Sequence, residues 1–355
     1  MDRRKDAERF RESLSLKRNK TKAKFTSVNE AIDHLLEICG RVGRNGKEPV
    51  QSSTVKYYRD ITERARSYPW LKTLDELDFE DAKAFREWLL RNYSRDMSRR
   101  VLSCVSSAVT ESIGHKNNPF IGVSISLDKE PVTIPSKADI RELMSAAYRL
   151  RNSNNRWISK AWERYYPMIR LMYATGMRTQ ELLAFPDFGL GKDHVKIIQA
   201  LKRTGQIGKP KSKMSERKIP VDRTFLEPVE WYLKNRWIEN DHRLIFSTEG
   251  GKPLSRENFR NKCWVPLMKE AGLVEKVSKG DGKFKFVPKF SPHAMRHYFA
   301  SMQIANDRVS NRLSVKRIQS LLGHASIQMT YDVYGHLLED EDPVLDNAIR
   351  EAMTL

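Results

Sequence analysis

Apolar residues spaced as on one face of a helix predict that residues 25–125 form a small all-helical domain. The first stripe recurs at intervals of three and four residues and comprises Val28, Ala31, Ile32, Leu35, Leu36 and Ile38. We expect N-caps at residues 52–54 and at Asp78, because Ser, Thr and Asp side chains accept hydrogen bonds from the first free N–H groups of a helix. A further helix is expected from Val101 to Gly114.

The pattern changes after residues 126–135, where Pro131, Pro135 and the lack of a clear period indicate an interdomain linker. Residues 136–340 are expected to form a mainly helical α+β domain. Its helices are predicted at residues 138–150, 162–174, 226–237, 258–271, 293–304, 314–322 and 327–334. Short strands at residues 195–201 and 217–221, joined by a basic turn, predict one small antiparallel sheet.

The charge of the chain points to a polyanionic partner. Its 355 residues carry a formal net charge of +19, and nucleic acid is the commonest partner of such a chain. Residues 1–24 hold ten Lys/Arg against four Asp/Glu. We interpret this segment as a basic arm that lies on DNA phosphates, the alternative being a solvated tail.

The cysteines of the chain favour a reducing, intracellular compartment. The chain has three widely spaced cysteines, and these form no CxxC pair and no disulfide framework. We expect each to be a small buried residue. No run of about 18 apolar residues and no apolar leader block is present, so neither a membrane span nor a membrane partner is expected.

Candidate chemistry begins at Arg178, which follows Gly176 at the start of a predicted helix. An arginine there offers a fork of donors to a phosphate, and Glu181, three residues on, can orient it. The alternative is an ordinary surface Arg–Glu pair. The lysine-rich turn at residues 209–218 is either a solvated hairpin tip or the source of a lysine that acts as a general acid.

Two histidine motifs and a tyrosine follow. His293 and Arg296 share a helix face near its positive end. His297 lies four residues after His293, a spacing that can bind zinc, but the glutamate of an HExxH motif is absent, so we expect no metal and interpret His297 as a buried supporting residue. His324 follows a helix-ending glycine, and Tyr334 follows it in turn; either alone would be taken for a structural residue.

Taken in order, these motifs resemble those of the tyrosine recombinases, the phage integrase family. The resemblance is close over residues 135–340. It is looser over residues 25–125, which match the family's SAM-like core-binding domain, and over the basic arm. It implies that Arg178 and Arg296 clamp the scissile phosphate, that His293 and His324 hydrogen-bond to it, and that His293 accepts the proton of the nucleophile.

The resemblance makes Tyr334 the nucleophile, which forms a 3′-phosphotyrosyl link to DNA. It lies ten residues after His324 and before Gly335-His336, as in the family, whereas the rival Tyr331 fills a variable position. The covalent link conserves the bond energy, so neither ATP, a metal nor another cofactor is expected. The family's Pro-Lys-Thr-Lys pattern aligns Lys211 with the catalytic lysine, ahead of Lys213 and then Lys209.

The implied function is site-specific recombination that integrates or excises a mobile element or viral genome. A homotetramer would act on double-stranded DNA sites through a Holliday junction, in the cytoplasm or nucleoid of a bacterium, and directionality can require an accessory DNA-bending protein. The tail at residues 341–355 either packs on a neighbouring subunit or folds back on its own domain. The alternatives are a type IB topoisomerase and a DNA-binding regulator that has lost catalysis.

Overall fold

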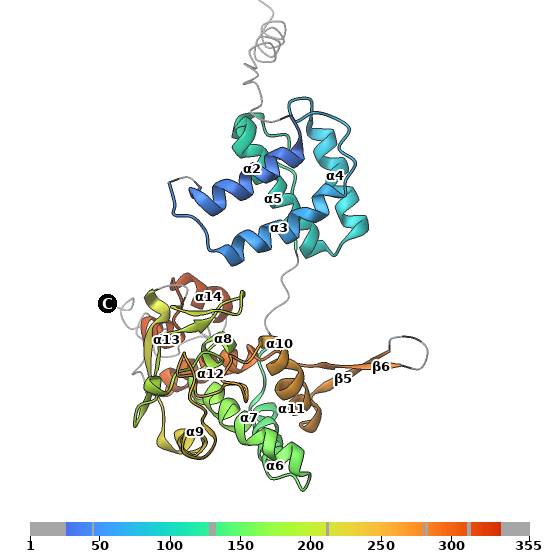
Figure 1. Ribbon diagram of the computed structural model, residues 1–355. Coiled ribbons are helices and arrows are strands. Elements are labelled where there is room, and N and C mark those ends of the chain that lie inside the picture. The colour runs from blue at the N-terminus through green and yellow to red at the C-terminus, as the bar shows by residue number, and fades with distance from the viewer. Residues whose placement is uncertain are drawn as a thin grey trace, which may run out of the picture. The chain divides into compact units, whose positions relative to one another are not determined.

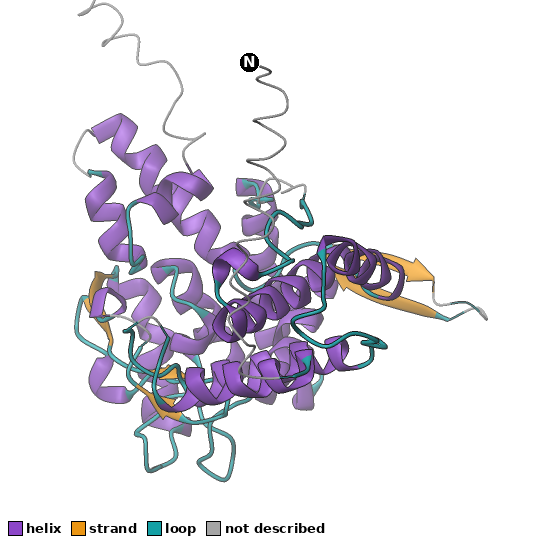
Figure 2. Cartoon of the chain, turned by 90° about the horizontal axis from the view of Figure 1, so that it is seen from above, coloured by secondary structure: helices purple, strands orange, loops and turns teal. Residues whose placement is uncertain are grey.

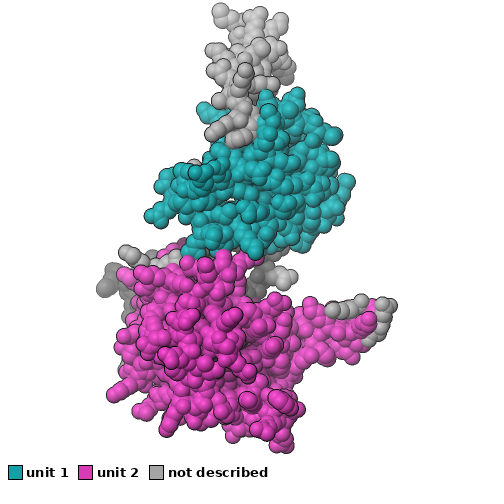
Figure 3. Space-filling view, in the orientation of Figure 1, with its two compact units in different colours: residues 1–130 teal, residues 131–355 magenta. Residues whose placement is uncertain are grey.

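The computed structural model describes residues 26–44, 46–127, 133–210, 213–278, 280, 283–310 and 314–334. The chain divides into two compact units, Met1–Glu130 and Pro131–Leu355 (Figure 3). The division falls inside residues 126–135, which the sequence marks as a linker. The basic arm at residues 1–24 and the tail at residues 341–355 lie outside the described residues.

The first unit is built from four α-helices in its described part: α2 (Val28–Arg41), α3 (Ser52–Arg66), α4 (Phe79–Asn92) and α5 (Arg95–Ile113), with a short 3₁₀ turn at His115–Asn117 (Figure 1). The predicted cap at Asp78 is confirmed, since its side chain accepts from the N–H groups of Glu80 and Asp81. The cap predicted at residues 52–54 is wrong, because the N-cap is Gln51 and no side chain bonds there.

The helix predicted from Val101 begins six residues earlier, at Arg95. Its first turns are polar and half exposed, so the apolar stripe that guided the prediction starts only where the helix becomes buried. Aromatic rings fill the centre of this unit around Phe85, which is fully buried. Its ring centroid lies 4.7 Å from that of Trp70, 5.0 Å from Tyr68 and 6.1 Å from Phe120.

The second unit is mainly helical, as predicted (Figure 2). Its helices are α6 (Lys137–Arg151), α7 (Arg156–Thr175), α8 (Thr179–Leu182), α9 (Arg223–Arg236), α10 (Arg256–Phe259), α11 (Val265–Glu270), α12 (Ala294–Ser310), α13 (Val315–Leu322) and α14 (Gln328–Tyr334). A π-helical turn at Arg260–Trp264 joins α10 to α11, so the helix expected at residues 258–271 is present but locally widened.

The predicted small antiparallel sheet is confirmed, but it is not the only one, since the described residues contain three two-stranded antiparallel sheets. The expected strands pair as β1 (His194–Ile197) with β4 (Arg217–Pro220), with Val195 opposite Ile219. The end of the first expected strand separates as β2 (Ala200–Leu201), which pairs with β3 (Ile207–Gly208).

The third sheet, the hairpin of β5 (Val274–Ser278) and β6 (Phe284–Pro288), was not predicted. It projects from the rest of the unit (Figure 1). Both of its faces are largely exposed, so it has no buried apolar face of the kind that identifies a half-buried strand.

The three cysteines are buried and unpaired, as expected. Burial raises the pKa of the Cys104 thiol to about 11, so this thiol stays protonated. Within the described residues, no helix combines the length and apolar character needed to cross a membrane.

The aromatic centre of the first unit generates a stability prediction. Replacing Phe85 by Ala should lower the free energy of unfolding of this unit by about 3–5 kcal/mol, because the ring leaves a cavity among its neighbours. Urea titration of the full chain, followed by tryptophan fluorescence, measures the loss. Phe79→Ala is the matched control, since Phe79 is 48% exposed. Equal losses in the two variants would contradict this account of the core.

Candidate active site

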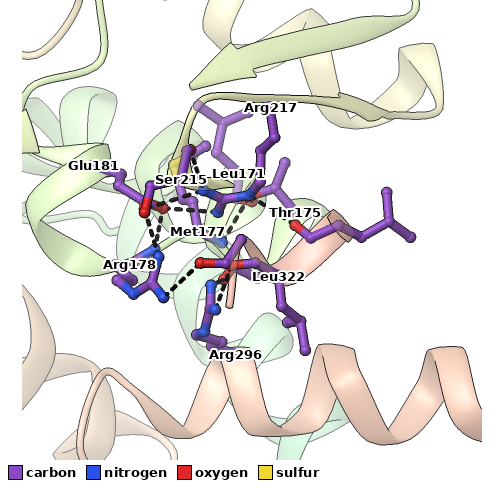
Figure 4. Close-up of polar contacts among 12 residues, drawn as sticks. Leu171, Thr175, Met177, Arg178, Glu181, Ser215, Arg217, Arg296 and Leu322 are labelled. Carbon is purple, nitrogen blue, oxygen red and sulfur yellow. Dashed lines mark hydrogen bonds and ion pairs between the residues drawn. The ribbon is translucent and has the colours of Figure 1, made fainter. Parts of the chain in front are cut away.

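Three arginines converge on the C-terminal end of α13 (Figure 4). Arg217 Nε donates to the carbonyl of Leu321 at 2.7 Å, Arg296 donates to the next carbonyl, and Arg178 Nη2 donates to that of Gly323 at 3.2 Å. The last carbonyls of a helix have no partner within the helix and carry a partial negative charge. The end of α13 therefore gathers cations from three distant parts of the sequence.

Glu181 is the carboxylate that holds two of these arginines. Its oxygens accept from Arg178 Nη1 at 2.9 Å, from the Arg178 backbone N–H at 2.9 Å and from Arg217 Nη2 at 2.8 Å. Burial alone raises the pKa of Glu181, but the hydrogen bond and charge of Arg217, together with Arg178, outweigh it and keep the pKa below its ordinary value. Glu181 thus stays ionised although only 3% of it is exposed.

Arg217 was missed by the sequence analysis, which treated it only as the first residue of a strand. A signal was nevertheless present. Side chains alternate in a strand, so Arg217 shares a face with Ile219, which is buried. A charged residue on the buried face of a strand needs an ionic partner, and here that partner is Glu181.

Hydrogen-bond counts separate the roles of the three arginines. A guanidinium carries five N–H groups. Arg217 makes four contacts through these groups, two with Glu181 and one each with the carbonyls of Ser215 and Leu321. Arg178 makes two, and Arg296 makes two, to Gly176 and to the end of α13. Counted over the described residues, Arg178 and Arg296 therefore retain donors for a further acceptor, whereas Arg217 is almost saturated.

Two glycines permit this close packing. Gly176 has φ +57°, and a Cβ there would lie 2.6 Å from the Phe299 ring; its carbonyl accepts from Arg296 Nη1 at 3.1 Å. Gly323 has φ +64°, and a Cβ there would lie 3.0 Å from Arg217 Nη1. Both ends of helices need the left-handed conformation that glycine adopts without strain.

The positive charges of these arginines act on the two predicted site histidines, His293 and His324. Desolvation, followed by the charges of Arg296 and Arg178, lowers the pKa of His324 to about 3. Desolvation, His297, Arg296 and Arg178 lower the pKa of His293 to about 4. His324 Nδ1 also contacts Thr330 Oγ1 at 2.9 Å. Both imidazoles are therefore neutral near pH 7.

Arg296 shows the same excess of positive charge. Its pKa is lowered to about 9, first by desolvation and then by Arg178 and Arg217. The guanidinium is thus buried close to two further cations, and at neutral pH it still carries its charge. An anion bound beside it would offset this concentration of positive charge.

Tyr334 lies in the same unit and is 1% exposed. Its hydroxyl is 2.7 Å from His297 Nδ1, and the two rings are 5.8 Å apart. Burial raises the pKa of Tyr334 to about 12, against the opposing effect of Arg296. The family resemblance implies that His293 accepts this proton, but among the described residues it is His297 that contacts the hydroxyl. The rival Tyr331 is 42% exposed.

The structure describes only part of the basic turn that holds the candidate lysines. Lys211 and the side chain of Lys213 lie outside the described residues, and Lys209 is exposed. Arg178, His293, Arg296, His324 and Tyr334 are all described.

Residues 136–341 match the sequence model of the phage integrase family. The chain belongs to the phage integrase family. It is a tyrosine recombinase, an enzyme that breaks and rejoins DNA strands.

Curated relatives of this tyrosine recombinase cover most of its length. The transposase from transposon Tn916 of Enterococcus faecalis is 26% identical over 310 residues, which span 80% of this chain and 69% of the relative. Tyrosine recombinase XerD of Staphylococcus saprophyticus is 24% identical over 303 residues, which span 82% of this chain and 90% of the relative.

Solved structures of tyrosine recombinases share the fold. The Tn1549 transposon integrase, in complex with a circular intermediate DNA, matches with a TM-score of 0.68 and 20% identity, over 92% of this chain and 99% of that one. A lambda integrase dimer bound to a COC′ core site matches with a TM-score of 0.60 and 16% identity, over 90% of this chain and 80% of that one.

Because the Arg217–Glu181 ion pair of this recombinase is buried, we expect even a conservative substitution in it to lower the free energy of unfolding. Arg217→Lys keeps the charge but loses the forked contact with Glu181, so the free energy of unfolding should fall by about 3 kcal/mol. Urea titration measures the change. Arg223→Lys is the control, because Arg223 is exposed and its replacement should have no measurable effect. Similar midpoints for Arg217→Lys and the wild type would refute the prediction.

The low pKa values of His293 and His324 predict a loss of stability in mild acid. In the unfolded chain these groups titrate near about 6.5, above their folded values of about 4 and about 3, so between these limits the unfolded state binds more protons. Stability should therefore fall as the pH drops below about 6.5. His324→Asn should reduce the slope of unfolding free energy against pH by up to about 1.4 kcal/mol per pH unit.

Urea titrations at several pH values between 5 and 7 measure this slope in the absence of DNA. Keeping the pH above 5 separates the effect of the histidines from protonation of Glu181. An unchanged slope in His324→Asn would show that His324 does not titrate differently in the two states.

Proposed function

We propose that this tyrosine recombinase is the integrase of a transposon-type mobile element, with Tyr334 as its nucleophile. The observation that carries the proposal is the pair of arginines, Arg178 and Arg296, which retain free donors in a site with excess positive charge. Its relatives named as transposon transposases support the choice of element.

In the proposed reaction, Arg178 and Arg296 bind the non-bridging oxygens of the scissile phosphate. The transition state gains negative charge on these oxygens, and fixed guanidinium groups stabilise that charge as it develops. Glu181 and Arg217 are positioning residues, because they hold Arg178 and leave its remaining donors directed away from themselves. Binding of the phosphate anion also raises the pKa of His293 and His324, which then donate hydrogen bonds to it.

Attack by the Tyr334 oxygen forms a 3′-phosphotyrosyl bond and releases the 5′ oxygen. Lys211 protonates that oxygen in this scheme, with Lys213 as the alternative. The energy of the broken phosphodiester is conserved in the new ester, so attack by a 5′-hydroxyl from a partner strand completes the exchange without ATP.

Strand exchange of this kind requires several protomers on DNA. We propose a homotetramer that exchanges two pairs of strands through a Holliday junction, as a lambda integrase tetramer has been crystallised on such a junction. The basic arm at residues 1–24 would add sequence-independent contacts to phosphates, and the tail at residues 341–355 is proposed to pack on a neighbouring protomer. An accessory DNA-bending protein would set the direction of recombination.

The proposed nucleophile has a direct test. The wild type should form a covalent adduct on a nicked suicide substrate that carries the ends of the element, and Tyr334→Phe should form none, because it lacks the attacking oxygen. Denaturing electrophoresis detects the adduct, and sequencing locates the cleaved bond. Tyr331→Phe is the matched control, and it should cleave like the wild type. An adduct that persists in Tyr334→Phe and disappears in Tyr331→Phe would transfer the role to Tyr331.

A further inference from the structure

The hydroxyl of Tyr334 contacts a histidine to which the sequence motifs assign no chemistry. His297 Nδ1 lies 2.7 Å from the Tyr334 oxygen, and both residues belong to the same unit, on α12 and α14. We propose that His297 is a catalytic residue, which orients the Tyr334 hydroxyl and receives its proton as the oxygen attacks phosphorus. This inference rests on the proposed role of Tyr334 as the nucleophile.

The position of the His297 ring is well defined by its surroundings. It follows Arg296 directly on α12, and its backbone carbonyl accepts from Ser301 Oγ at 2.9 Å. On one side its ring meets His293 edge-on, with centroids 4.8 Å apart. On the other side it meets Tyr334. A neutral imidazole has one nitrogen that accepts a hydrogen bond, and contact with a phenol, which donates, places that acceptor at Nδ1.

The state of Tyr334 shows why a proton acceptor is needed. Burial raises the pKa of Tyr334 to about 12, so at neutral pH only about one molecule in 10⁵ carries the phenolate. A nucleophile that is not ionised beforehand must lose its proton during attack, and a base in hydrogen-bond contact provides the shortest route. Desolvation, followed by Arg296, lowers the pKa of His297, so the ring is neutral and able to accept.

His293 is the weaker candidate for this step. Desolvation, His297, Arg296 and Arg178 lower its pKa to about 4, which makes it a weak base. Among the described residues, the Tyr334 hydroxyl has no hydrogen bond to His293. His293 is also exposed, which suits a residue that meets the DNA phosphate.

The charged groups around His297 explain why the proposed proton transfer from Tyr334 would occur only after DNA binds. The titratable neighbours of His297 are His293, which directly precedes α12, Arg296 on α12 and Tyr334 on α14; on α7, Tyr173 stacks instead on Tyr298. No described side chain of α13 forms a hydrogen bond with the imidazole. A phosphate bound to Arg296 offsets the charge that lowers the basicity of His297. Proton uptake is thereby coupled to the arrival of DNA.

The step balances without any additional reactant. The Tyr334 O–H bond breaks and an N–H bond forms at His297 Nδ1, while the oxygen bonds to phosphorus and the bond to the 5′ oxygen breaks. The leaving oxygen takes its proton from the general acid. Rejoining reverses each event, so His297 returns its proton to Tyr334 and the enzyme ends in its starting state.

Single-turnover formation of the covalent adduct tests the inference in the full chain. The rate is measured on the nicked substrate with saturating protein at pH values from 5.5 to 8.5, for the wild type, His297→Phe and His297→Asn. Asparagine keeps an acceptor near the position of Nδ1 but takes up no proton in this range. Both variants should lose about 100-fold in rate. The wild-type rate should rise with pH as the His297 imidazole loses its proton, and this rise should be absent in His297→Asn.

Controls separate this chemistry from folding and from DNA binding. Gln303→Ala, at a half-exposed position further along α12, should cleave within about twofold of the wild type, and thermal melting and DNA affinity should match across all variants. His297→Asn or His297→Phe cleaving at the wild-type rate, or faster, would overturn the inference. Absence of any Tyr334-dependent adduct in the wild type would instead overturn the proposed function, and the inference with it.

Discussion

The site depends on one buried carboxylate. Glu181 compensates Arg217 and orients Arg178, and the carbonyls at the end of α13 take up further donors of all three arginines. Removing one partner of a buried ion pair typically costs about 3–5 kcal/mol, because the other charge stays in a medium of low dielectric. The helix N-terminus at Arg178, the strand at Arg217 and the end of α13 are therefore held together by charge as well as by apolar packing.

That arrangement leaves the site with an excess of positive charge. Among the described residues, Glu181 is the one carboxylate that bonds to these arginines, and its charge does not balance three guanidinium groups. Desolvation first, and then this excess of positive charge, lower the pKa values of Arg296, His293 and His324. An anion that binds there would raise these pKa values and stabilise the folded state by linkage. The same excess of positive charge would therefore favour phosphate binding and lower the stability of the site when no anion is bound.

Much of this could be predicted from sequence because the relevant signals are local. Arg178 follows a glycine that ends a helix, Glu181 is its capping partner, and Leu322-Gly323 ends α13 where the pattern required it. The roles of Arg217 and His297 depend instead on residues 36 or 37 positions away along the chain, at Glu181 and Tyr334. No periodicity encodes such a pairing. The exposed β5–β6 hairpin was missed for the opposite reason, since it buries too little to impose a pattern.

The turn after α13 connects the proposed phosphate-binding arginines to the proposed nucleophile. Arg178 bonds to the Gly323 carbonyl, the next residue is His324, and His324 contacts Thr330 on α14, the helix that ends at Tyr334. A phosphate that draws on Arg178 and Arg296 thereby acts on the segment that positions the tyrosine. Tyr334 is buried and protonated before that event, and a buried, protonated phenol attacks nothing. In the proposed mechanism, Tyr334 therefore becomes reactive only when the substrate phosphate binds.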